Sequence, residues 1–149
     1  MRIDHQRLRK LTSDMLIAMG SASEEVGIVT DHLIEANLKG HPSHGVGMIP
    51  AYVRNWRGGH LRPNQHVQRV QQHGTIAVFD GQMGYGQVVA REATQWAIEM
   101  ARDSGSAIYT LRHAPHIGRV GTYAEQAVAA DRARVHRHPD GGCCGAGDS

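Results

Sequence analysis

Apolar residues recur at helical spacing over the first forty positions of the chain. Two stretches carry an apolar stripe on one face, and they end at Gly20 and Gly40. Asp4 can cap the first helix, and Ser21 with Glu24 has the spacing of a capping box for the second. The pattern therefore predicts two helices that pack as an antiparallel hairpin.

A third helical pattern follows, and Ser43 stands where its N-terminal cap is expected. Pro50 lies inside this pattern. Because proline lacks a backbone donor, we expect it to kink or restart the helix. Gly58 and Gly59 are expected to end it.

The second half of the chain alternates between strand and helix patterns. The expected elements, in order, are strands 67–72 and 75–80, a helix 86–104, a strand 106–112 and a helix 119–130. The fold class predicted is α/β of the α+β kind. A helical subdomain (1–59) precedes the start of a mixed sheet with covering helices (60–130).

The composition changes after Ala130. The segment DRARVHRHPDGGCCGAGDS, residues 131–149, contains no Leu, Ile, Met, Phe, Trp or Tyr. Such a segment cannot bury enough apolar surface to fold by itself, so we predict disorder there. The abrupt change suggests a truncated or frameshifted gene product with a non-native tail.

Charge and composition exclude several classes of protein. The formal charge is +2 with no basic run, so nucleic acid is not an expected partner. No apolar stretch approaches the roughly 20 residues of a membrane span. The N-terminus carries charges where a signal peptide needs an apolar core, and the two cysteines are adjacent in sequence. We therefore expect a cytoplasmic protein without a disulfide framework.

Two histidine motifs are the candidates for chemistry, GHPSHG at 40–45 and HIGRVG at 116–121. In the first, exposed amides near His44 could bind an anionic group. In the second, His116 follows a predicted strand and precedes a predicted helix, where ligands gather in α/β folds. A histidine there can act as general acid and base. From spacing alone, His44 is better explained as a polar loop residue at a helix end. His116 fits a solvated loop histidine as well as it fits a catalytic one.

Two other readings are weaker. The segment GYGQVVA at 84–90 resembles a degraded dinucleotide fingerprint, but the expected acidic residue is absent after the next strand. It would serve a small Rossmann-type binder only if the strand 75–80 were not antiparallel to 67–72. His113 and His116 are three residues apart, yet the chain has neither HExxH nor CxxC, so no metal site is predicted.

Three segments together resemble a known family: DHLIEANLKGHPSHGVGMIPAYVRNWRGGHL (31–61), FDGQMGYGQVVAREA (79–93) and HIGRVGTYAEQA (116–127). They are similar to the malate/L-lactate dehydrogenase family of NAD(P)-dependent oxidoreductases, which has a non-Rossmann nicotinamide-binding fold. The likeness is greatest to the bacterial hydroxycarboxylate dehydrogenase branch. It implies hydride transfer between a small 2-hydroxy acid, or the matching 2-oxo acid, and NAD or NADP.

The resemblance also implies roles for individual residues. His116 matches the general acid/base of the family. His44 matches a residue that contacts cofactor and substrate, and Ser43 matches a polar position in the substrate site. The segment that matches the family's cofactor contact comprises Gly118, Arg119 and Val120.

The chain departs from the family in two places. Several relatives carry an arginine for the substrate carboxylate where this chain has Met48. Relatives also continue far beyond the helix 119–130, so we expect an N-terminal fragment with little or no activity alone. Full-length relatives are expected to be homodimers. The alternative is a non-catalytic fragment that serves as a dimerisation or interaction module.

Overall fold

The computed structural model describes residues 3–135, and it shows an α/β fold with five α-helices, two 3-10 turns and three strands in that range. Residues 136–149 of the predicted tail lie outside the described residues. The elements are α1 (His5–Ala18), α2 (Ser23–Leu38), η1 (Pro42–His44), η2 (Val46–Met48), α3 (Ile49–Arg57), β1 (Gln68–His73), β2 (Ile76–Asp80), α4 (Gly86–Ser104), β3 (Ile108–Arg112) and α5 (Gly121–Val135).

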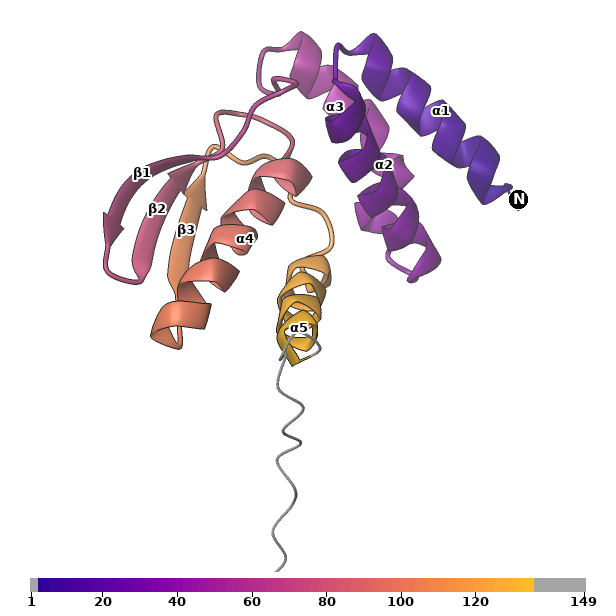
Figure 1. Cartoon of the computed structure of the whole chain (residues 1–149). Helices are drawn as coiled ribbons and strands as arrows, with labels where there is room; N and C mark the ends of the chain where they lie inside the picture. The colour runs from indigo at the N-terminus through magenta and orange to yellow at the C-terminus, as the bar shows by residue number, and fades with distance from the viewer. Residues whose placement is uncertain (1–2, 136–149) are drawn as a thin grey trace, which may run out of the picture.

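The first two helices pack against each other as the sequence predicts (Figure 1). Asp4 caps α1, because its side chain accepts the amide protons of Gln6 and Arg7. The capping box predicted for α2 is wrong, since the N-cap is Ala22, whose side chain cannot accept a hydrogen bond from the helix. Instead, Asn64 accepts the Ala22 amide proton through its side-chain oxygen at 2.7 Å.

The third helix begins later than predicted. Ser43 lies in the short turn η1 and does not cap an α-helix, so that prediction is wrong. The chain is diverted because the Val46 amide donates to the side-chain oxygen of Asn37 on α2, at 2.8 Å. Helix α3 starts at Ile49, and Pro50 occupies its first turn, where a missing donor costs nothing.

Three strands form one mixed sheet in the order β1-β2-β3. β1 and β2 are the predicted antiparallel hairpin, and β2 and β3 run parallel. The antiparallel pairing excludes the small Rossmann-type reading of residues 84–90. Helix α4, which begins within that segment, has the predicted limits 86–104.

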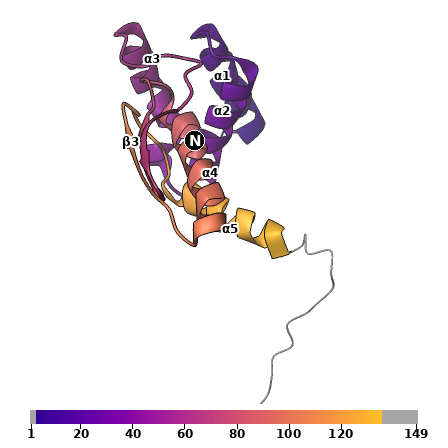
Figure 2. The same cartoon turned by 60° about the vertical axis from the view of Figure 1, so that its left-hand side comes forward.

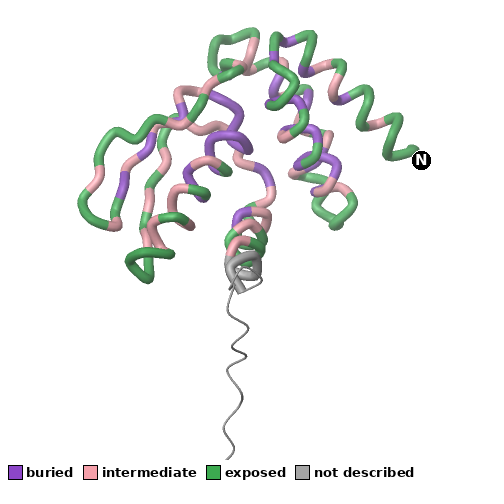
Figure 3. Tube along the Cα trace, in the orientation of Figure 1, coloured by how far each residue is buried: buried purple, intermediate pink, exposed green. Residues whose placement is uncertain are grey.

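The elements stack as successive layers: the sheet, then α4, then α2, then α1 (Figures 1 and 2). One buried cluster lies between the helices and includes Leu16, Val29, Leu33 and Val88. A smaller cluster around Phe79 lies between the sheet and α4. Figure 3 shows the buried stretches concentrated on α2 and at the start of α4, the helices that the loop before α5 contacts through His32 and Gly86.

The sheet face opposite to α4 is open. Ile76 and Ile108 are register partners on this face and are 52% and 62% exposed. Strands β1 and β3 are the edges of the described sheet. None of the helices between residues 3 and 135 combines the length and the apolar character of a membrane span.

Helix α5 begins at Gly121, two positions after the predicted start, and continues past Ala130 to Val135. Residues 113–120 therefore form a connection between β3 and α5. This connection carries His116 and the three residues Gly118–Val120.

Candidate functional site

His116 lies in the connection between β3 and α5 and is half-buried against α3. Its Nδ1 is 2.8 Å from the hydroxyl oxygen of Tyr52, a buried residue of α3. Burial raises the pKa of Tyr52 to about 12, so its hydroxyl stays protonated at neutral pH. The hydrogen bond fixes one edge of the His116 ring and leaves the Nε2 edge for a ligand.

The second histidine motif meets the first at this point. The rings of His44 and His116 are stacked, with centroids 5.4 Å apart and planes inclined by 28°. The Ser43 hydroxyl oxygen is 3.0 Å from Nδ1 of His44. Although Ser43 does not cap a helix, the structure brings Ser43, His44 and His116 together on one surface.

Tyr52 is itself held by a side chain from the start of α4. The amide nitrogen of Gln87 donates to the Tyr52 hydroxyl oxygen at 2.5 Å. Gln87 is 1% exposed, and its side-chain oxygen has no hydrogen-bond partner among the described residues. With the amide in this orientation, the Tyr52 proton points to Nδ1 of His116, which places the proton of the neutral imidazole on Nε2.

The two hydrogen bonds that link Gln87, Tyr52 and His116 run in the opposite direction if the Gln87 amide group turns by half a turn. The amide oxygen would then accept a hydrogen bond from the Tyr52 hydroxyl, and the Tyr52 oxygen would accept a hydrogen bond from the Nδ1–H group of His116. In that arrangement Nε2 carries a free lone pair. The three side chains can therefore support either an Nε2 donor or an Nε2 acceptor.

The pKa of His116 is lowered, first by burial and second by the neighbouring His44. Because a charged imidazolium is disfavoured, His116 is neutral at pH 7 and can accept a proton. This is the protonation state that a base needs for the oxidation of an alcohol.

The backbone of the His116 loop lies against the N-terminus of α4. A Cβ atom added to Gly86 would stand 2.5 Å from the His116 carbonyl oxygen. The motif at 84–90 thus has a structural role, as its glycines permit a close approach of helix and loop. On the other side, the Tyr123 hydroxyl donates to the Ile117 carbonyl oxygen at 2.5 Å.

The three residues expected to touch a cofactor differ in what they offer. Val120 is 66% exposed, while Gly118 is buried and has a φ of +76°. The Arg119 guanidinium is 2.6 Å from a carboxylate oxygen of Glu125 and lies near Glu35. The positive charge of Arg119 is therefore already paired within the protein.

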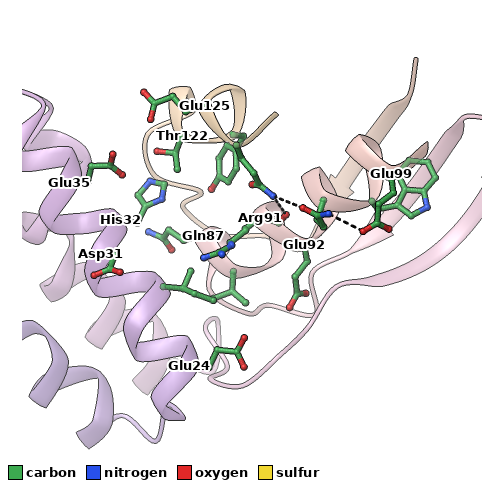
Figure 4. Close-up of a pocket in the computed structure, with 16 residues that line it drawn as sticks. Glu24, Asp31, His32, Glu35, Gln87, Arg91, Glu92, Glu99, Thr122 and Glu125 are labelled. Carbon is green, nitrogen blue, oxygen red and sulfur yellow. Dashed lines mark hydrogen bonds between the residues drawn. The ribbon is translucent and has the colours of Figure 1, made fainter. Parts of the chain in front are cut away.

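A groove of about 720 Å³ lies between α2, α4 and α5, behind the His116 loop. Figure 4 shows His32 and Gln87 facing into it from opposite helices. Arg91 also lines the groove. The carboxylates that line it are those of Glu24, Asp31, Glu35, Glu92, Glu99 and Glu125. The groove is acidic and is distinct from the surface that carries His44 and Ser43.

The described residues contain no cluster of three or more His, Cys, Asp or Glu side chains arranged to hold a metal ion. His113 is not paired with His116, because its Nδ1 lies 2.9 Å from the Asp80 carboxylate. The tail residues His136, His138, Cys143 and Cys144 lie outside the described part of the chain.

Residues 3–136 match the family model described as malate/L-lactate dehydrogenase. The chain belongs to this family. The match extends past Ala130, into the first residues of the segment whose composition differs.

Three relatives illustrate the relation to known dehydrogenases. Hydroxycarboxylate dehydrogenase B from Escherichia coli K12 is 45% identical over 135 residues, which are 91% of this chain and 37% of that protein. The structure of sulfolactate dehydrogenase from Methanocaldococcus jannaschii aligns with a TM-score of 0.82 at 34% identity, over 88% of this chain and 38% of that one. The structure of malate dehydrogenase from Pyrococcus horikoshii aligns with a TM-score of 0.78 at 32% identity, over 85% of this chain and 36% of that one. This member of the malate/L-lactate dehydrogenase family thus spans well under half the length of these relatives.

Sequence reasoning missed three side chains of the site: Tyr52, Gln87 and His32. Each is buried although it is polar or ionisable. A signal existed for His32, which interrupts the apolar stripe of α2 beside Leu33. Buried polar residues of this kind need a partner, and that requirement is a reason to search for one.

Proposed function

We propose that this chain forms one side of the active site of an NAD(P)-dependent 2-hydroxy-acid dehydrogenase, with His116 as general acid and base. The observation that carries the proposal is the pairing of His116 with Tyr52 at 2.8 Å and with His44 across the stacked rings. These residues come from two stretches far apart in the sequence, 31–61 and 116–127, and both resemble the family. The named activities of the relatives support the same reaction class.

In the oxidation direction, neutral His116 accepts the hydroxyl proton of the 2-hydroxy acid at Nε2 while Nδ1 donates to Tyr52. In the reduction direction, Nε2 returns the proton to the oxygen of the 2-oxo acid. The Gln87 amide can match either polarity through Tyr52. Ser43 and His44 bind the polar groups of the substrate beside His116, and Met48 adds no charge for its carboxylate.

The bound NAD or NADP would accept or donate the hydride. The stacked imidazoles of His44 and His116, together with the exposed Val120 on the same loop as His116, fit one side of a nicotinamide ring. The Arg119 side chain is paired with Glu125 and its amide donates to His32, so we assign the cofactor contact of this segment to the exposed Val120 beside it. The acidic groove behind the loop does not suit the phosphates of a dinucleotide, since like charges repel.

We also propose that a second copy of the chain and a small 2-hydroxy or 2-oxo acid are the partners of this protein. The open sheet face with Ile76 and Ile108 favours self-association. Because the chain spans 37% of hydroxycarboxylate dehydrogenase B, we expect little or no turnover from this chain alone.

Cofactor titration tests the proposal directly. NADH and NADPH fluorescence is followed as each is added to the 149-residue protein, to His44→Ala and to His73→Gln. His73 is the matched control, since it is an exposed histidine at the far end of β1. We expect saturable binding by the wild type and His73→Gln, and binding weakened about tenfold in His44→Ala, the effect of one lost contact of about 1.4 kcal/mol.

Oxamate, an inert analogue of a 2-oxo acid, is then added to the cofactor-bound protein while the histidine signals are followed by NMR. We expect the His116 signals to shift and those of His73 to stay in place. Absence of saturable binding for both cofactors would contradict the proposal and favour a non-catalytic interaction module.

A further inference from the structure

His32 has no part in the proton transfer described above, yet it is 6% exposed and faces the groove from the middle of α2. We infer that His32 is a positioning residue that holds the loop 116–121, and therefore His116, against helix α2. This inference rests on the proposed function for its catalytic meaning. Its structural content can be tested separately.

The first observation is a hydrogen bond across 87 positions of sequence. Nε2 of His32 accepts the backbone amide proton of Arg119 at 2.8 Å. An accepting Nε2 requires a neutral ring whose proton is on Nδ1. The imidazole thus satisfies the amide that follows Gly118 within the loop.

The second observation is steric. Gly118 has a φ of +76°, a conformation that side-chain-bearing residues rarely adopt. A Cβ atom added there would overlap Nε2 of His32. The His32 ring therefore fills the space that a side chain at position 118 would need, so the ring and the glycine fit only together.

The remaining contacts explain why the loop 116–121 is held in a single conformation. Tyr123 on α5 holds the Ile117 carbonyl oxygen, and Gly86 on α4 lies against the His116 carbonyl oxygen. His32 supplies the contact from α2. The backbone on both sides of Gly118 is thus fixed by three helices, and the ring of His116 is placed at its distance from Tyr52.

Histidine suits this position because it can accept a hydrogen bond while buried. Burial is the main cause that lowers its pKa, and it keeps the ring neutral. The charged or titratable groups that act on His32 or face it are those of Glu35, His44, His116, Arg119 and Tyr123. Glu35 favours protonation of His32, whereas Arg119 and both other histidines oppose it.

The test compares wild type with His32→Leu, which keeps bulk but accepts no hydrogen bond, and with His32→Gln, whose amide oxygen can replace Nε2. Val29→Ala is the matched control, because Val29 is buried in the same helix but belongs to the helical core cluster. Hydrogen exchange of the Arg119 amide and the pKa of His116 are measured by NMR in all four proteins. NADH affinity is measured in parallel.

We expect exchange protection of the Arg119 amide to fall about tenfold in His32→Leu, as one buried hydrogen bond is lost. The pKa of His116 should move toward its ordinary value, because a looser loop exposes the ring. His32→Gln should restore most of the exchange protection of the Arg119 amide and bring the pKa of His116 most of the way back to its wild-type value. Val29→Ala should lose stability while both readouts stay as in the wild type.

The inference is overturned if His32→Leu changes neither readout beyond the change in Val29→Ala. If His32→Leu does not fold, His32→Asn takes its place, because its shorter amide does not reach Arg119. Loss of NADH binding in every protein, with the Arg119 and His116 changes present, would overturn the proposed function and leave the positioning role of His32 intact.

Discussion

Protonation of His32 is expected to destabilise the fold as the pH falls from 7 to 4. His32 is buried, and this lowers its pKa from 6.5 to about 4. Between these values the unfolded chain takes up a proton that the folded protein excludes. The contribution of the neutral His32 ring to the free energy of unfolding is therefore complete above pH 6.5 and is lost as the pH falls toward 4. The shift corresponds to about 3 kcal/mol at most.

Urea unfolding followed by far-UV circular dichroism measures this effect. Free energies of unfolding are determined for wild type and His32→Gln at several pH values between 7 and 4. The glutamine stays neutral throughout, and the other titrating groups are common to both proteins. We expect the wild type to lose up to about 3 kcal/mol more than the variant across this range. Parallel pH profiles for the two proteins would refute a buried neutral His32.

Three further outcomes are expected. Gly118→Ala should lower the free energy of unfolding by about 2–4 kcal/mol, because the positive φ is combined with overlap against the buried His32 ring. Gly74→Ala has a positive φ but open space around it, so it should lower the free energy of unfolding by about 1 kcal/mol in the same urea assay. Equal losses of unfolding free energy in the two variants would contradict a steric overlap between a side chain at position 118 and His32. Tyr52→Phe should cost about 1–3 kcal/mol, since a buried amide partner is left unpaired, and should change the pKa of His116 as read by NMR; an unchanged pKa would contradict the pairing. Ile108→Lys should reduce concentration-dependent association in sedimentation velocity, and association equal to that of wild type would show that the open sheet face is not involved.

Local patterns in the sequence were sufficient for most of the elements. The limits of α4 follow from its apolar period, the glycine-rich turn before it and Gly105 after it. The β1–β2 hairpin follows from two strand patterns around a turn at Gly74. These features depend on neighbours within a few residues, which is why a single sequence reveals them. The two histidine motifs were visible for the same reason.

The tertiary structure decided the features that depend on distant partners. Ser43 lost its predicted helix cap because Asn37 on another helix takes the amide that would have continued the turn. The partnership of Tyr52 with His116 joins positions 64 residues apart, and no local pattern marks it. The sequence by itself thus determined the order of the elements, the hairpin and the candidate histidines. Packing between helices and loop decided which side chains surround those histidines, because buried polar groups must find partners wherever the fold places them.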